Sequence, residues 1–351
     1  MDISAKALHN NRIDYLDFCR GLCMIAVVLG HAGVFPLIRV TFTFHLPVFL
    51  IISGYFFNPE ISLVDMIKKK LKSLIIPYFT ACSLIIVSFL IVTVLSGNAD
   101  FRTICSGLIR WFLASLCGVG NNCNYPIFLF GIGAIWFLWA IFWGEIILRA
   151  LFYLPAVLRI ISVFVLVFIA KFTADYSVFL PLSIQPGCMI ILYIYIGYLW
   201  RKYKDKLKTL HLAIKISAVV LALLIWAEFI YNFQSFWLVD CDCGRGIWDI
   251  FGSVCASFMV IGISFLADKY LHRFSKIIRF LGKYSMVALM AHTIEMDTFP
   301  WSNLNALLPE VVKTTGFDLV ITIILRLIWI FLFTYVITKL RFAHKAFGIK
   351  K

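Results

Sequence analysis

The chain alternates long apolar runs with short polar connections. About 20 apolar residues suffice to cross a hydrocarbon core of about 30 Å, and ten runs approach that length. Their predicted ranges are 17–34, 41–58, 74–96, 132–150, 156–172, 178–200, 211–233, 246–268, 278–298 and 316–340. We therefore predict an all-α fold, a polytopic integral membrane bundle of about ten transmembrane helices. We find no internal repeat, low-complexity segment or soluble domain, so residues 1–351 are predicted to form a single integral membrane domain.

Composition and charge support this class and give an orientation. The 351 residues are 62% hydrophobic and only 14% charged, whereas soluble domains are nearer half apolar and a quarter charged. A formal net charge of +14 could suggest nucleic acid, but most basic residues lie in connections on one side of the predicted spans. Basic connections mark the cytoplasmic side. We therefore predict cytoplasmic N- and C-termini, contact with a lipid bilayer and no nucleic-acid partner.

One predicted outer connection, residues 97–131, is unusually long. Within it, Ile104 to Leu116 is too short and interrupted to span, so we predict an interfacial or re-entrant helix. Five cysteines lie in or beside outer connections: Cys105, the pair Cys117 and Cys123, and the pair Cys241 and Cys243. A disulfide within the first pair, a link between the pairs, or free thiols all fit an exterior location. These connections offer no histidine or paired CxxC, so no metal site is predicted.

The first predicted hairpin, residues 12–57, carries polar side chains where a lipid-facing helix would not. Arg20 and His31 are eleven residues apart, so they share a helix face about 16 Å apart along the axis. A buried arginine costs about 2.5–3.5 kcal/mol even on insertion scales, and Asp17 lies three residues earlier, close enough to pair with Arg20. Alternatively, Arg20 could extend its charged end to the membrane surface, and His31 could be a hydrogen-bonded residue of the core, with no role in function.

Short motifs then indicate a family. Arg20 and His31 resemble the R-X10-H signature of the acyltransferase-3 family, with the closest likeness to its fucose 4-O-acetyltransferase-like sugar branch. Other similar segments follow in order: Phe44-His45-Leu46-Pro47 with Ser53-Gly54-Tyr55-Phe56-Phe57, Lys68-Lys69-Lys70-Leu71-Lys72 before Ile76-Pro77-Tyr78, Ile135-Trp136-Phe137-Leu138, Ile196-Gly197-Tyr198 before Arg201-Lys202, and Leu281-Gly282-Lys283-Tyr284-Ser285 before His292. Tyr284 stands where this branch more often has Asn. The resemblance covers about residues 12–300.

This resemblance implies a membrane O-acyltransferase. Such an enzyme moves an acyl group from cytoplasmic acyl-CoA to a hydroxyl, commonly on a glycan at the outer side. We expect acetyl-CoA as the donor, a carbohydrate acceptor, no metal, and a location in a bacterial inner membrane. A transporter or flippase is the rival, because intramembrane Arg, Glu and His also mark transport paths. Transporters often contain inverted repeats, and the sequence shows none.

Three histidines from different spans are predicted to reach a similar depth. With the N-terminus inside, His31, His45 and His292 all lie beyond the midplane, and Glu295 is one turn after His292. Acyl transfer to a hydroxyl needs a base, a group that orients it and donors for the tetrahedral oxyanion. Imidazole, with an ordinary pKa of about 6.5, suits the base role. We predict His31 as the base, with Glu295 or His292 orienting it or contacting the acceptor. Local hydrogen bonding or packing could also explain His45, His292 and Glu295.

The predicted substrate-binding residues are Arg20, His45, Ser53, Trp136, Lys70 and Lys72. Lys and Arg bind the phosphates of coenzyme A well, although positive-inside topology alone also explains the lysine cluster. Ser53 could permit passage of the pantetheine arm or only close helix packing. Trp136 could line an acceptor site or belong to an aromatic belt at the membrane interface.

Further charges fall inside the predicted spans. Glu145 and Arg149 are four residues apart, a spacing that favours a helical ion pair. Arg326 lies about ten residues into the last span and must face the interior or a cavity.

Overall fold

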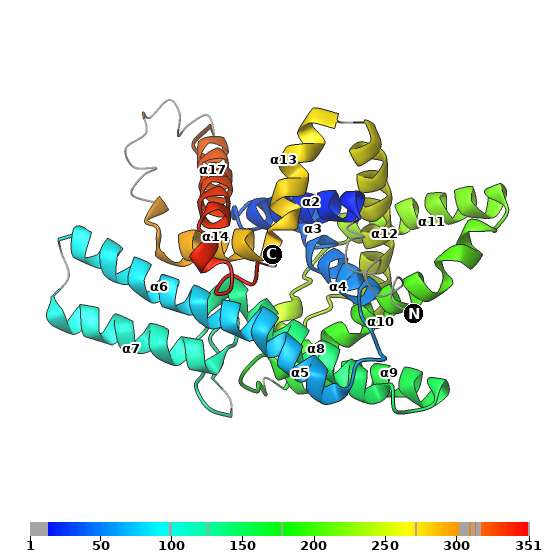
Figure 1. Cartoon of the computed structure of the whole chain (residues 1–351), viewed down its shortest axis with the longest axis horizontal. Coiled ribbons are helices and arrows are strands. Elements are labelled where there is room, and N and C mark those ends of the chain that lie inside the picture. The colour runs from blue at the N-terminus through cyan, green and yellow to red at the C-terminus, as the bar shows by residue number, and fades with distance from the viewer. Residues whose placement is uncertain are drawn as a thin grey trace, which may run out of the picture.

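The fold is helical throughout the described part of the chain. A computed structural model describes residues 13–97, 100–124, 126–176, 178–270, 272–301 and 317–349, with positions 309 and 313. Two isolated β-bridges join outer-loop residues, and no strand is present among the described residues. Figure 1 shows the helices gathered into one bundle. The predicted all-α fold is confirmed.

The helices follow the predicted apolar runs closely. The first half contains α2 (Asp14–Gly30), α3 (Phe35–Thr41), α4 (His45–Tyr55), α5 (Leu63–Lys70), a π-helical turn η1 (Leu71–Ile75), α6 (Ile76–Leu95), α7 (Phe101–Cys117), η2 (Gly133–Trp136) and α8 (Phe137–Leu151). The second half contains α9 (Ala156–Asp175), α10 (Ile184–Lys208), α11 (Leu212–Tyr231), η3 (Leu238–Asp240), α12 (Ile247–Tyr270), α13 (His272–Lys283), α14 (Ser285–Thr298), α17 (Phe317–Lys339) and η4 (Arg341–Ala343).

Seven helical segments of the described chain are long and apolar enough to cross a membrane: Phe35–Tyr55, Leu63–Leu95, Gly133–Leu151, Ala156–Asp175, Leu212–Tyr231, Ile247–Tyr270 and Phe317–Lys339. Three predicted spans correspond to helices outside this set. Two of them, α2 and α14, have only 17 and 14 residues, and α10 has 25 but ends in basic residues. The multi-pass membrane character is confirmed, while the number of crossings and the side of the termini stay predictions.

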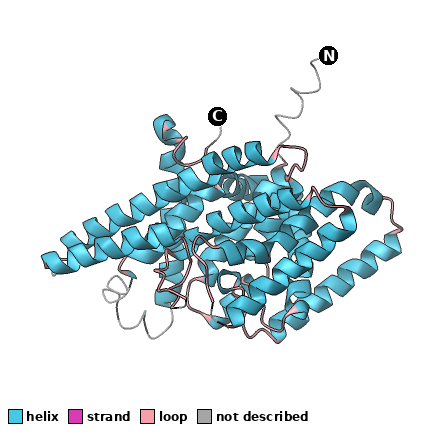
Figure 2. Ribbon diagram, turned by 90° about the horizontal axis from the view of Figure 1, so that it is seen from below, coloured by secondary structure: helices cyan, strands magenta, loops and turns pink. Residues whose placement is uncertain are grey.

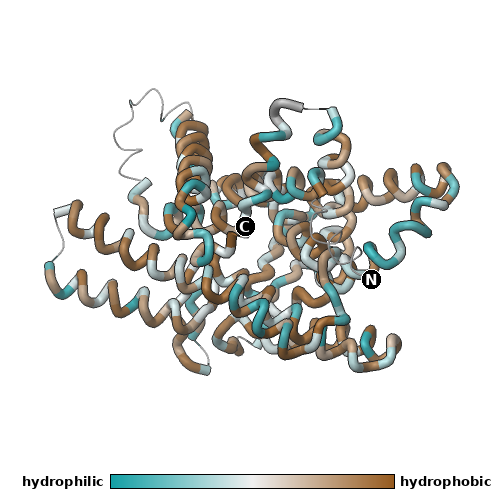
Figure 3. The backbone as a smooth tube through the Cα atoms, viewed as in Figure 1, coloured by the Kyte–Doolittle hydropathy of each residue, from teal (hydrophilic) through white to brown (hydrophobic). Residues whose placement is uncertain are grey.

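Apolar outer surfaces agree with a membrane location. Figure 3 shows long hydrophobic stretches along α6, α11 and α17. Large side chains on these helices are exposed, among them Leu95, Leu224 and Leu332. Such broad exposure is costly in water but favourable against lipid chains.

The predicted span 278–298 is wrong as a single helix. The structure divides it at Tyr284 into α13 and α14. The division follows from packing, because α13 lies directly against α2. A Cβ at Gly282 would overlap the backbone carbonyl of Asp17, and one at Gly21 would overlap that of Ile278. Glycine at both positions lets the two backbones touch, and the chain turns away after that contact.

The helix predicted within residues 97–131 is present and is longer than expected. The short helix expected over Ile104 to Leu116 is the 17-residue α7, which Asp100 caps by accepting a hydrogen bond from the Thr103 amide at 2.9 Å. It ends at Gly118, whose left-handed backbone (φ 63°) suits glycine. Figures 1 and 2 show α7 lying side by side with α6, extending from the bundle. The helix therefore packs lengthwise on an apolar helix, which the sequence pattern did not indicate.

All ten cysteines are free thiols in the structure. Cys123, Cys241 and Cys243 are buried, and Cys117 is partly buried. Of the alternatives that the sequence left open, the structure has the free thiols.

Candidate functional site

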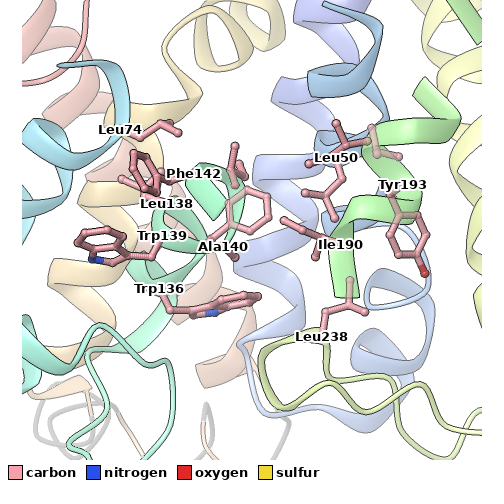
Figure 4. Close-up of a cluster of buried hydrophobic side chains, with 14 of the residues drawn as sticks. Leu50, Leu74, Trp136, Leu138, Trp139, Ala140, Phe142, Ile190, Tyr193 and Leu238 are labelled. Carbon is pink, nitrogen blue, oxygen red and sulfur yellow. The ribbon is translucent and has the colours of Figure 1, made fainter. Parts of the chain in front are cut away.

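A cavity of about 470 Å³ lies between α2, α4, α8 and two loops, residues 118–133 and 232–246. Figure 4 shows part of its wall, with Leu74 at one end of the apolar cluster and Trp136 and Leu238 at the other. Most of the wall is apolar, and its polar groups gather near these two ends. Six of the nine residues predicted to bind or react line the cavity: Arg20, His31, His45, Ser53, Lys70 and Trp136.

His31 ends α2 and is held in one orientation. Its Nδ1 lies 2.8 Å from the carbonyl oxygen of Val27, and a carbonyl can only accept, so Nδ1 donates. In a neutral imidazole the lone pair is then on Nε2, which is not hydrogen bonded to any described residue. The carbonyl of His31 accepts a hydrogen bond from Arg326 Nη1 at 3.1 Å. Nε2 of His31 can therefore accept a proton from a molecule in the cavity.

His45 opens α4 in the same manner. Its Nδ1 donates to the carbonyl of Thr41 at 2.7 Å, which again leaves the lone pair on Nε2. The ring packs 4.7 Å from Phe42, and Phe42 lies 5.7 Å from the ring of His31. Phe42 therefore separates two imidazoles that face the same cavity.

His292 and Glu295 lie behind this wall, on α14. The two imidazole rings of His31 and His292 have centroids 5.2 Å apart. His292 Nδ1 donates to Glu295 Oε1 at 2.8 Å, and Glu295 Oε2 accepts from Trp301 Nε1 at 2.6 Å and lies 3.5 Å from Arg326 Nε. Both His292 and Glu295 are fully buried. His292 Nε2 is buried without a partner among the described groups.

This arrangement specifies what Glu295 does. The carboxylate orients His292 rather than His31, whose own Nδ1 is held by the backbone. The prediction that Arg326 faces the interior is confirmed, because it contacts both Glu295 and the end of α2. This buried carboxylate therefore has the hydrogen-bonding and cationic partners that burial requires.

The opposite end of the cavity is cationic. Lys70 forms an ion pair with the buried carboxylate of Glu145, whose Oε1 accepts a hydrogen bond from Ser53 Oγ at 2.6 Å. Arg20 Nη1 lies 3.5 Å from Asp17 Oδ1, which confirms that predicted pair, and its guanidinium lies over the ring of Phe56. Lys70 directly precedes the π-helical turn, a feature that often marks functional sites.

One prediction about charged residues is wrong in detail. The structure pairs Glu145 with Lys70 instead of Arg149. Arg149 donates instead to the carbonyl of Ile61 at 2.6 Å and stacks on Tyr153. A spacing of four residues on one helix would permit an ion pair between Glu145 and Arg149. In the folded chain the carboxylate instead pairs with Lys70, which comes from α5. Lys72 is exposed and lies outside the cavity wall.

The cavity also contains residues that the sequence did not single out. Asn121 and Trp237 reach it from the two loops. Neither belongs to a recognisable motif, so only the folded structure identifies them. Trp139 is buried beside Tyr78.

Comparison with known proteins identifies the family. A family model described as an acyltransferase domain, that of the acyltransferase-3 family, matches residues 13–340. No curated protein and no solved structure matches the chain. The family match includes every helix that forms the cavity. The chain therefore belongs to the acyltransferase-3 family and is a multi-pass membrane acyltransferase.

Proposed function

We propose that this protein is an O-acetyltransferase of the sugar-modifying, fucose 4-O-acetyltransferase-like branch. It would transfer an acetyl group from cytoplasmic acetyl-CoA to a hydroxyl of a cell-surface glycan or its precursor. The inner membrane would hold it, with both termini in the cytoplasm. One observation supports this most strongly: a single cavity has cations at one end and proton acceptors at the other.

The cationic end suits an anionic donor. Arg20 and Lys70 both line the cavity there, and the donor phosphates would compete with their carboxylate partners for them. Ser53 adds a hydroxyl on the same wall. The thioester would then extend along the apolar middle of the cavity toward His31. Lys72 is too exposed to take part within the cavity.

The reaction follows from the state of His31. Its Nε2 lone pair removes the proton of the acceptor hydroxyl as that oxygen attacks the thioester carbonyl carbon. The tetrahedral intermediate then expels the thiolate, and the proton held on Nε2 passes to that sulfur. The products are an acetyl ester and the free thiol of coenzyme A. His292, ordered by Glu295, lies beside His31 and stabilises the positive charge that the ring carries between these steps.

A transporter remains the rival only on general grounds, since polar groups also line transport paths. The two proposals differ chemically. A transporter would release no coenzyme A and would yield no acetylated product.

The test is acetyl transfer by the purified protein in liposomes with labelled acetyl-CoA and a mixed glycan acceptor. Replacing His31 by Ala should lower kcat by about 10²–10⁴ and leave the donor KM nearly unchanged. Replacing Arg20 by Ala should mainly raise the donor KM. His211, an exposed histidine at the start of α11, provides the matched control, and His211→Ala should retain full activity. Full transfer by a stably folded His31→Ala protein would refute the base assignment.

A further inference from the structure

Two outer loops close the end of the cavity near the imidazoles. One comprises residues 118–133 and the other residues 232–246. Among the described residues, the side-chain hydrogen bonds between the two loops form a clamp, in which Asn121 Nδ2 donates to both carboxylate oxygens of Asp240 at 3.0 and 2.8 Å. Asn121 is exposed yet lines the cavity. The clamp therefore lies at the mouth, where a molecule entering from this side must pass.

Trp237 lies on the cavity wall next to this clamp. Its ring packs 4.5 Å from Phe42, the residue that separates His31 from His45. Its backbone is fixed by a reciprocal pair of 3.0 Å hydrogen bonds with Asp242. The backbone of Trp237 is therefore fixed, and only the ring of Phe42 lies between its indole and His31, the proposed base. A rigid amphipathic ring at a wet boundary is suited to binding ligands that have both an apolar face and polar edges.

The clamp leaves some hydrogen-bonding groups at the mouth of the cavity available to a ligand. Asn121 Oδ1 has no hydrogen-bond partner among the described residues, and the two Asp240 oxygens offer further lone pairs. The cationic lining residues, Arg20 and Lys70, lie at the far end of the cavity. The mouth thus offers an aromatic face, hydrogen-bonding groups and the carboxylate of Asp240.

We propose that Trp237, Asn121 and Asp240 form an acceptor subsite for a neutral, hydroxyl-rich sugar ring. The apolar face of the sugar would lie on Trp237, and its hydroxyls would bind the amide and the carboxylate. The negative charge of the mouth would disfavour acidic sugars such as uronates. This subsite rests on the proposed function, because it presents one sugar hydroxyl toward His31. It adds a binding role to residues that lie outside every family motif in the sequence.

The competing explanation is that the clamp only ties the two loops together. Loss of the clamp would then loosen the fold without changing which sugars bind. A measurement of sugar binding that does not require turnover separates the two explanations. It also separates failure of this subsite from failure of the acetyl-transfer proposal.

The experiment uses saturation-transfer NMR on the full-length protein in detergent micelles. The probes are methyl glycosides of glucose, galactose, mannose and fucose, with methyl glucuronide as the acidic member. Wild type should bind at least one neutral glycoside more tightly than the glucuronide. Asn121→Ala and Trp237→Leu should each weaken that binding about tenfold. Asp240→Asn removes the charge and one of the two clamp hydrogen bonds, because an asparagine side chain offers only one acceptor oxygen to Asn121. It should narrow the preference for neutral over acidic sugar severalfold.

Two matched controls come from the same side of the molecule. Asn124 is exposed in the same loop as Asn121, and Trp248 is exposed at the start of α12. Asn124→Ala and Trp248→Leu should bind sugar as wild type does. The inference is overturned if wild type binds no neutral glycoside, or if Asn121→Ala and Trp237→Leu bind as well as the controls. Release of coenzyme A from acetyl-CoA, measured in parallel, tests the proposed function separately.

Discussion

Replacing Glu295 by Gln should disable the imidazole pair without changing the shape of the site. All three groups around this carboxylate are donors: His292 Nδ1, Trp301 Nε1 and the guanidinium of Arg326. Glutamine offers one acceptor oxygen and one NH₂ donor in the same space. In either amide orientation, a donor must therefore face a donor. If the NH₂ faces His292, the ring must switch tautomer, and its buried Nε2 becomes a donor.

The magnitude follows from the bonds that change. A hydrogen bond to a charged group contributes about 1.5–3 kcal/mol. Each 1.36 kcal/mol is a factor of ten in rate. If the lost interaction stabilises the imidazolium in the transition state, kcat should fall about 10- to 100-fold. The donor KM should stay within about twofold, because Glu295 does not line the cavity.

The assay is steady-state acetyl transfer at saturating donor, with thermal unfolding measured on the same preparations. Trp329→Phe is the matched control, since it removes a 3.0 Å hydrogen bond to the Ala291 carbonyl between the same two helices, α14 and α17. That variant should lose some stability but keep its kcat. Wild-type kcat in a Glu295→Gln protein of unchanged stability would show that Glu295 does not act through His292.

Three further outcomes are expected. Lys70→Gln should raise the donor KM about tenfold in transfer kinetics, whereas Lys72→Gln, outside the cavity, should leave it within about twofold. Gly54→Ala should destabilise the protein by about 2 kcal/mol in thermal unfolding, because the added Cβ would overlap the backbone of Ile194 on α10; an unchanged melting temperature would contradict the packing. Burial raises the pKa of the Cys123 thiol to about 11, so folding favours the protonated thiol and this contribution to stability is lost as pH rises from about 9 to 11. Alkylation of Cys123 should therefore still accelerate between about pH 10 and pH 11, and a rate that levels off by about pH 10, as for an ordinary thiol, would refute the raised pKa.

The sequence was sufficient to predict where the helices lie. Apolar runs of about 20 residues have few alternatives in a membrane, so most predicted ranges agree with the observed helices within a few residues. It failed at residues 278–298, where the apolar pattern continues across a break. The break follows directly after the close contact between Gly282 and the backbone of Asp17, and a contact between distant segments leaves no periodic signal.

The sequence could identify candidate site residues where a charged or polar side chain inside a membrane span costs free energy. Arg20, His31 and Arg326 stand out because a membrane helix tolerates such residues only with partners. The partners themselves were harder to predict. Glu145 has a basic residue at helical spacing, yet it binds Lys70 from α5. Asn121 and Trp237 lie in polar loops, where neither residue type is unusual.

The two helices that carry the site together restrict the donor. α2 places Arg20 and His31 about 16 Å apart along its axis, and α4 places Ser53 and His45 eight residues, or about 12 Å, apart. The imidazole ends of both helices meet at Phe42, while Arg20 and Ser53 line the cavity at its other end. A donor held at the cationic end must therefore reach about 12–16 Å to place its carbonyl beside His31. Small acyl donors such as acetyl phosphate cannot bridge that distance. An anionic head group joined to a thioester by a long flexible arm can, and this geometric requirement supports acyl-CoA as the donor independently of the sequence motifs.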